Sequence, residues 1–180
     1  MALRKAGAYS KRYARPYTRK SSKKSQNFIR SVPPQKIVKF KMGEIKGYEG
    51  GKFNIILRMI STEHVQIRDN ALEATRQYIH KQLEEQIPGQ YYFEVRVFPH
   101  HVLRENKMLT GAGADRMQKG MAHSFGGTMG RAAFVKAKGE IFLVGVSSEK
   151  GRKAVYGVFQ RVKSKLPCGI RVHTEIKKVV

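Results

Sequence analysis

Residues 141–176 read IFLVGVSSEKGRKAVYGVFQRVKSKLPCGIRVHTEI, and this stretch decides the fold class. Its opening run, Ile141–Val146, is almost entirely apolar and predicts a strand near the middle of a sheet. Residues 149–165 carry apolar side chains at helical spacing, which predicts an amphipathic helix. Residues 170–176 then alternate apolar and polar side chains, as a closing strand does. The apolar stripe of the helix consists of Val155, Val158, Phe159, Val162 and Leu166.

Alternation of apolar and polar residues also predicts strands earlier in the chain. Three such runs cover residues 38–42, 53–59 and 91–97. A fourth run, residues 131–138, predicts a hairpin with the apolar strand that follows it, turning at Lys138-Gly139-Glu140. Strands that follow one another through short turns favour a mainly antiparallel sheet.

Apolar spacing over residues 63–86 predicts a second long helix, which Pro88-Gly89 terminates. The predicted fold class is therefore α+β: a two-layer sandwich in which two amphipathic helices pack on a mainly antiparallel sheet. The expected division is a basic extension over residues 1–35 and a single domain over residues 36–180, which includes a glycine-rich loop at residues 99–130.

The N-terminal extension is the most basic part of a very basic chain. Lys and Arg number 36 against 13 Asp and Glu, a formal net charge of +23, which indicates a polyanionic partner. The first acidic residue is Glu44. Cations that neutralise phosphates and tyrosines that stack on bases predict an RNA-binding arm. The candidate rRNA-binding residues are Arg4, Lys5, Tyr9, Lys11, Arg12, Tyr13, Arg15, Tyr17, Arg19, Lys20, Lys23, Lys24 and Arg30.

Other polyanions are less consistent with this sequence. Its apolar runs are too short to span a bilayer, and the basic N-terminus has no apolar stretch behind it, as a secretory signal would. A solvated tail and a transit peptide remain alternatives for the extension. The single cysteine, Cys168, favours a reducing compartment. DNA compaction is disfavoured because neither predicted helix carries a basic reading face.

The loop over residues 99–130 is long for a compact domain, and such loops are usually functional or disordered. Its glycines permit close approach of the backbone to a ligand, and its cations favour a phosphate-rich ligand. The sequence therefore predicts a second RNA contact. The candidate residues are His100, His101, Arg104, Lys107, Gly111, Gly113, Arg116 and Lys119.

An enzymatic reading of this loop finds little support. Gly111-Ala112-Gly113 resembles the start of a dinucleotide fingerprint, but Arg116 occupies the position of the third glycine. Neither His100-His101 nor the pair of Cys168 and His173 has the spacing of a metal site. We therefore expect no catalytic residues, no metal and no cofactor. The alternative hypothesis, from a different functional class, is that the chain is a free-standing RNA chaperone or RNA-modifying enzyme.

Residues 95–120 read VRVFPHHVLRENKMLTGAGADRMQKG and resemble a known family. They are similar to the large-subunit ribosomal protein called L-sixteen in bacteria and L-ten-e in archaea and eukaryotes. The loop sequence is close to that of the archaeal and eukaryotic branch. The resemblance extends over nearly the whole chain. Further matching stretches are Pro16-Tyr17, residues 32–43, residues 71–74 and residues 120–127.

The resemblance implies a cytoplasmic protein of the large ribosomal subunit that is not an enzyme. It implies a body lodged among large-subunit rRNA helices close to 5S rRNA, in contact with neighbouring ribosomal proteins. It also implies that the loop after Pro99 points toward the tRNA sites near the peptidyl transferase centre. Members of the family are added late in subunit assembly, which implies contacts with assembly factors.

Overall fold

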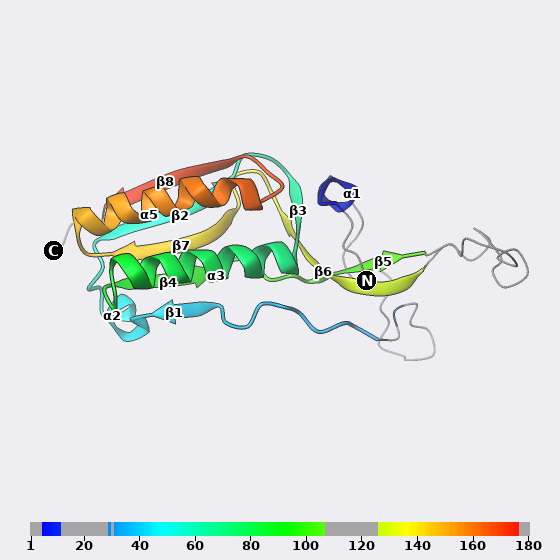
Figure 1. Cartoon of the computed structure of the whole chain (residues 1–180), viewed down its shortest axis with the longest axis horizontal. Helices are drawn as coiled ribbons and strands as arrows, with labels where there is room; N and C mark the ends of the chain where they lie inside the picture. The colour runs from blue at the N-terminus through cyan, green and yellow to red at the C-terminus, as the bar shows by residue number, and fades with distance from the viewer. Residues whose placement is uncertain (1–4, 12–28, 30, 107–125, 177–180) are drawn as a thin grey trace, which may run out of the picture.

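The computed structural model describes residues 5–11, 29, 31–106 and 126–176 and forms two antiparallel sheets. The larger sheet has the order β1-β4-β7-β2-β8 and the smaller one the order β3-β6-β5 (Figure 1). The larger sheet comprises β1 (Lys41–Gly43), β4 (Tyr91–Val95), β7 (Glu140–Val146), β2 (Ile55–Ser61) and β8 (Ile170–Ile176). The smaller comprises β3 (Val65–Arg68), β6 (Gly127–Val135) and β5 (His101–Glu105). The helices are α1 (Gly7–Ser10), α2 (Ile45–Glu49), α3 (Asp69–Gln86), α5 (Glu149–Val162) and the 3-10 turn η3 (Lys163–Lys165).

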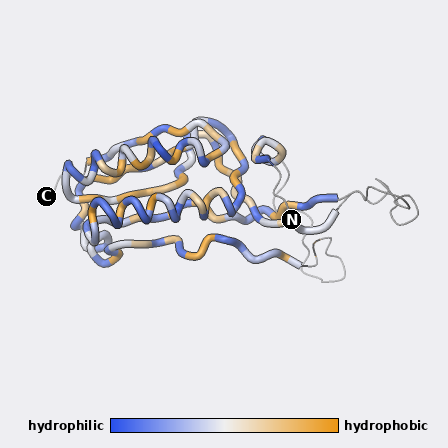
Figure 2. The backbone as a smooth tube through the Cα atoms, viewed as in Figure 1, coloured by the Kyte–Doolittle hydropathy of each residue, from blue (hydrophilic) through white to orange (hydrophobic). Residues whose placement is uncertain are grey.

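Helices α3 and α5 run side by side over one face of the larger sheet (Figure 1). Both helices alternate hydrophilic and hydrophobic positions along their length, while β7 is largely hydrophobic (Figure 2). The Ser148 hydroxyl caps α5 by accepting the amide of Gly151 at 3.1 Å, which satisfies one of the unpaired donors of the first turn. The main core fills the space between the helices and the sheet, with Leu57, Ile79, Phe142 and Phe159 fully buried.

Several predictions from the sequence are confirmed. The chain is α+β with antiparallel sheets, and the helix over residues 149–165 corresponds to α5 and η3. The strands predicted at 53–59, 91–97 and 170–176 correspond to β2, β4 and β8, with boundaries shifted by about two residues at most, as end effects usually produce.

The predicted helix over residues 63–86 is wrong in its first part. Val65–Arg68 form β3, which pairs with β6, and α3 begins only at Asp69. Three consecutive side chains of β3, Val65, Gln66 and Ile67, are buried, so both faces of the strand are covered, one by apolar groups and the other by the Gln66 amide. The alternation of Val65 and Ile67 with Gln66 and Arg68 spans only four residues, and Val65 also fits the helical spacing of Leu72 and Ile79, so the sequence extended the helix over the strand.

The predicted hairpin of residues 131–138 with 141–146 is also wrong. The chain does turn at Lys138, which adopts a φ of 64°, but β6 pairs with β3 and β5 whereas β7 pairs with β2 and β4. At the crossing the Ser61 carbonyl accepts the amide of Lys138 at 2.8 Å, and the Ser61 amide donates to the carbonyl of Gly139 at 3.0 Å. The two connections, β2 to β3 and β6 to β7, therefore pass together from one sheet to the other.

Two further boundaries differ from the prediction. The strand expected over residues 38–42 shortens to β1, and Val38 is 74% exposed where a half-buried side chain was expected. The loop expected over residues 99–130 loses both ends to strands, because His101–Glu105 form β5 and residues 127–130 belong to β6. The glycines of β6 weakened its strand signal in the sequence.

Candidate nucleic-acid interface

The hairpin of β5 and β6 extends away from the helix-covered sheet (Figure 1). Its register runs from His101 opposite Ala132 to Glu105 opposite Gly127, so the segment over residues 107–125 connects two strands whose ends are paired. That segment lies outside the described residues. It contains five of the predicted contact residues, namely Lys107, Gly111, Gly113, Arg116 and Lys119.

Gly126 stands where the chain enters β6, directly beside the end of β5. Its φ is +76°, and a Cβ at this position would lie 2.5 Å from the carbonyl carbon of Glu105 and 2.6 Å from the amide nitrogen of Asn106. Both the backbone conformation and the close approach require glycine. The hairpin therefore brings the two ends of the glycine-rich segment together through a position that admits no side chain.

The histidines and the arginine at the start of the predicted loop have three different environments. His100 is exposed and lies against the ring of Phe98, with a centroid distance of 4.5 Å. His101 is 8% exposed and packs at 5.0 Å on Phe134, so it is a buried strand residue and not the loop group that the sequence predicted. Burial lowers the pKa of His101, and the charge of Arg104 lowers it further. Arg104 itself is half-buried in β5.

Tyr9 packs its ring against other residues of the chain, whereas the sequence predicted that the ring stacks on RNA bases. It is 7% exposed and packs with Leu103 of β5 and Ala132 of β6. Its carbonyl accepts a hydrogen bond from the Gln66 side chain at 2.9 Å, and the guanidinium of Arg68 lies 5.4 Å from its ring centroid, a cation–π distance. The first turn of the N-terminal extension is thus packed on the smaller sheet.

Only two cations of the predicted arm fall within the described residues. Lys5 and Lys11 flank α1 and are both exposed, so they remain available to a polyanion. The other predicted arm residues lie outside the described part of the chain: Arg4, Arg12, Tyr13, Arg15, Tyr17, Arg19, Lys20, Lys23, Lys24 and Arg30.

Sequence reasoning missed the residues that fasten this end of the molecule. The Arg131 guanidinium donates from Nε to the carbonyl of Pro33 at 2.6 Å, which ties the end of the extension to the base of the hairpin. Asp69 lies at the same junction, where its carboxylate accepts the amide of Asn70 at 2.8 Å. Burial raises the pKa of Asp69, and the charge of Lys36 partly opposes that shift. Asp69 is one of two aspartates in the chain, which was the only available signal.

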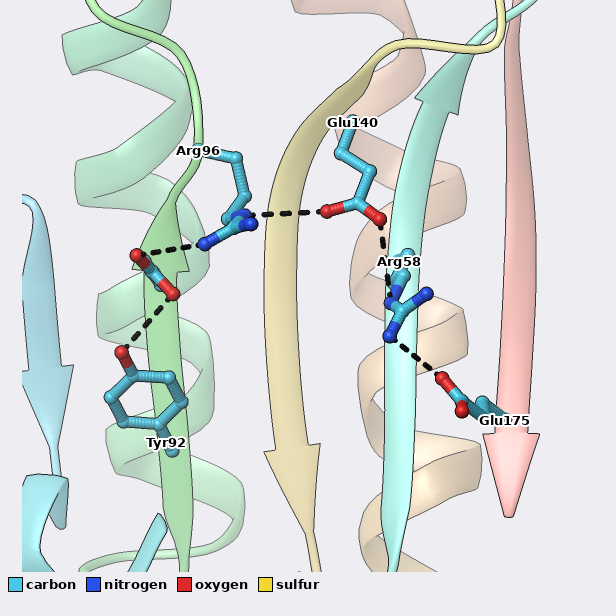
Figure 3. A network of polar contacts seen from close by, with 6 residues as sticks. Arg58, Tyr92, Arg96, Glu140 and Glu175 are labelled. Carbon is cyan, nitrogen blue, oxygen red and sulfur yellow. Dashed lines mark hydrogen bonds and ion pairs between the residues drawn. The ribbon is translucent and has the colours of Figure 1, made fainter. Parts of the chain in front are cut away.

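The face of the larger sheet opposite α3 and α5 carries a chain of ion pairs that crosses four strands (Figure 3). Arg96 contacts Glu94 and Glu140, each at 3.3 Å. Arg58 lies 3.5 Å from Glu140 and 2.7 Å from Glu175. These two arginines are directed at carboxylates of the same chain, so neither presents a free positive charge to a polyanion.

The described residues offer little to chemistry other than binding. Across residues 5–11, 29, 31–106 and 126–176, no three His, Cys, Asp or Glu side chains come close enough together to hold a metal ion. The described helices are too short or too polar to cross a membrane. Cys168 is a free thiol whose pKa is raised mainly by burial, which opposes formation of the reactive thiolate.

A strongly basic chain whose cations cluster in an N-terminal extension has the electrostatic pattern of a nucleic-acid-binding protein. Comparison with known proteins agrees: residues 15–173 match the family described as Ribosomal protein L16p/L10e. The chain belongs to this family, whose members are structural ribosomal proteins and not enzymes.

Its relatives in archaea match along almost their full length. The chain is 43% identical to the large ribosomal subunit protein uL16 of Hyperthermus butylicus over 178 residues, which covers 96% of this chain and 93% of that protein. It is 41% identical to uL16 of Thermofilum pendens over 176 residues, with 97% and 98% covered. Against uL16 of Methanococcus maripaludis the identity is 40% over 176 residues, with 96% and 94% covered.

Proposed function

We propose that this chain is a structural constituent of the large ribosomal subunit, in the cytoplasm, and that it binds large-subunit rRNA through its N-terminal extension. The observation that carries the proposal is its similarity to archaeal uL16 proteins over nearly the whole of both chains. The acid-free composition of residues 1–43 supplies the positive charge that rRNA phosphates require.

The second part of the proposal concerns the hairpin. Its tip, residues 107–125, extends toward the tRNA sites near the peptidyl transferase centre, and residues His100, Arg104, Lys107, Arg116 and Lys119 supply its polar contacts. Support comes from the position of the hairpin, which stands clear of the helix-covered sheet (Figure 1), and from the glycine at position 126 that closes it.

The extension and the domain have different functions in this proposal. Residues 1–35 act as the rRNA anchor, while residues 36–180 form the domain that carries the hairpin. Docking of α1 on the smaller sheet links the two, because Tyr9 joins the extension to both strands of the hairpin. Neighbours in the subunit are 5S rRNA, other ribosomal proteins and factors of late assembly.

Binding to a large-subunit rRNA fragment at increasing salt tests the rRNA contact. If six to ten phosphates are neutralised, the logarithm of the affinity falls with the logarithm of the salt concentration at a slope of roughly −5 to −9. A nearly flat response would contradict the proposal.

Deleting residues 107–125 tests the hairpin separately. Because the deletion leaves the extension and the core in place, rRNA binding should persist, while subunit maturation or tRNA accommodation should fail. Loss of rRNA binding in this variant would show instead that the hairpin is an anchor.

A further inference from the structure

A groove of about 480 Å³ opens between the edge strand β1 and helix α3. One wall is the segment from Val38 to Ile45 and the other is the exposed side of α3 around Gln77 and His80. The groove is lined by residues of the larger sheet's edge and of α3, outside the smaller sheet and the hairpin strands.

The apolar surface of this groove is unusually exposed. Val38 is 74% exposed and Ile45 37%, and both belong to the few large apolar side chains that the described structure leaves at its surface. Met42 lies between them in sequence and is 5% exposed, so it connects the groove to the main core. An apolar strip on so basic a chain indicates a contact with a partner that combines apolar area and negative charge.

Two lysines border this apolar strip. Lys39 and Lys41 are both exposed, and within the described part of the chain neither forms an ion pair. The third cation of the groove differs, because Arg76 is buried and held by Glu73 at 2.6 Å. That bond lowers the pKa of Glu73, which stays ionised and neutralises Arg76. The free positive charge of the groove therefore comes from Lys39 and Lys41.

The opposite wall provides polar groups in fixed positions. His80 is held by the Tyr91 hydroxyl, 2.8 Å from its Nδ1, and Tyr91 in turn donates to Glu84 at 2.6 Å. Gln77 donates its amide to Glu73 at 2.9 Å, which leaves its carbonyl oxygen as an acceptor at the groove. An extruded base can pack against apolar side chains while fixed polar groups hydrogen-bond its edge, and this groove provides both.

We propose that this groove binds one unpaired nucleotide of RNA. The base lies on Val38 and Ile45, its edge faces Gln77 and His80, and the flanking phosphates contact Lys39 and Lys41. This inference rests on the proposed function, since it assigns a single-stranded feature of RNA to a part of the body to which the proposed function gives no RNA contact.

An acidic peptide is the other ligand that could match the charge of the groove. A peptide that docks on an edge strand gains most of its affinity from backbone hydrogen bonds along the strand. Strand β1 has only three residues, and lysines stand on it and just before it, which is how proteins protect an edge from strand addition. The groove therefore favours a nucleotide over a peptide.

Methyl NMR on the full chain locates the ligand directly. The probe is a single-stranded hexa-adenylate, compared with a hexamer of the same sugar–phosphate backbone without bases and with a hexaglutamate peptide. The methyl signals of Val38, Met42 and Ile45 should shift in a saturable way with the hexa-adenylate alone. Binding of the RNA without these shifts overturns the inference and leaves rRNA binding by the extension intact. Equal shifts with the abasic hexamer or with the peptide also overturn the inference. Failure of the chain to bind any RNA overturns the inference and contradicts the proposed function as well.

A matched pair of variants separates the groove from general charge. Lys39→Gln with Lys41→Gln removes two positive charges at the groove, and Lys150→Gln with Lys153→Gln removes two exposed charges from α5. The groove variant should lower the affinity for hexa-adenylate roughly tenfold and the α5 variant by less than about threefold, because only the first loses direct phosphate contacts. Equal losses would overturn the inference.

Discussion

The chain passes repeatedly between the two sheets of this protein, yet the two sheets are packed in part by different segments. The larger sheet is covered by α3 and α5, and the core between them also includes Val65 and Ile67 of β3. The smaller sheet is packed in part by Tyr9, a residue of the N-terminal extension. The larger sheet thus carries most of the main core, while the end that carries the hairpin is packed in addition by the segment proposed to bind rRNA.

Truncating the core of the larger sheet should have the largest effect. Phe142 is fully buried, and its ring lies 5.8 Å from that of Phe93. Phe142→Ala should lower the free energy of unfolding by about 3–5 kcal/mol, because it removes apolar area and leaves a cavity. Urea denaturation followed by circular dichroism measures this loss. A loss of less than about 1 kcal/mol would show that the core is not where the stability resides.

Removing the Tyr9 side chain should loosen only the smaller sheet. Tyr9→Ala removes the packing of the ring against Leu103 and Ala132 and its cation–π contact with the Arg68 guanidinium. We expect a local cost of about 1–2 kcal/mol. Hydrogen exchange should accelerate for the amides of β5 and β6 and stay unchanged in β2 and β7. The conservative variant Tyr9→Phe should retain most of the protection, and uniform acceleration across both sheets would contradict the comparison.

Much of the larger sheet could be predicted from the sequence, whereas little of the smaller one could. Strand β2 and helix α5 carry their burial pattern in their own residues, so local periodicity was sufficient. Strand β6 pairs with β3, which lies much earlier in the chain. The sequence instead predicted a hairpin between β6 and β7, because these two segments follow one another directly.

The predicted site shows the same limit. Tyr9 sits among cations in the sequence, and nothing in those neighbours indicates that Leu103 and Ala132 bury it. His101 was assigned to a loop because two adjacent histidines obscure the strand that contains it. Composition could predict that the extension binds a polyanion, but only the tertiary structure separates its packing residues from its exposed ones.

Acid should weaken the smaller sheet before it weakens the larger one. The folded pKa of His101 lies below its ordinary value of 6.5 because of burial and, secondarily, Arg104. The neutral form therefore stabilises the fold above pH 6.5, and this contribution is lost as the pH falls through that value toward the folded pKa. Hydrogen exchange of β5 at pH 5.5, corrected for intrinsic rates, should exceed that at pH 7.5. His101→Gln should remove the difference, and its persistence in that variant would assign it to another group.

The smallest effect is expected on the sheet face opposite the helices. Arg58→Met breaks two ion pairs of the network in Figure 3, but both carboxylates remain partly exposed and regain water. The free energy of unfolding, measured by thermal denaturation, should change by less than about 1 kcal/mol in this variant. The affinity for rRNA should not change, because Arg58 is directed at Glu140 and Glu175. A marked loss of affinity would show that this face contacts RNA after all.

Sedimentation of tagged protein in an archaeal cell extract tests the central claim most directly. The wild-type chain should co-migrate with large ribosomal subunits and resist moderate salt. A variant in which the basic residues of positions 4–30 are replaced by glutamine should remain folded and stay at the top of the gradient. Failure of the wild-type chain to co-migrate, or equal co-migration of the neutralised variant, would contradict the account.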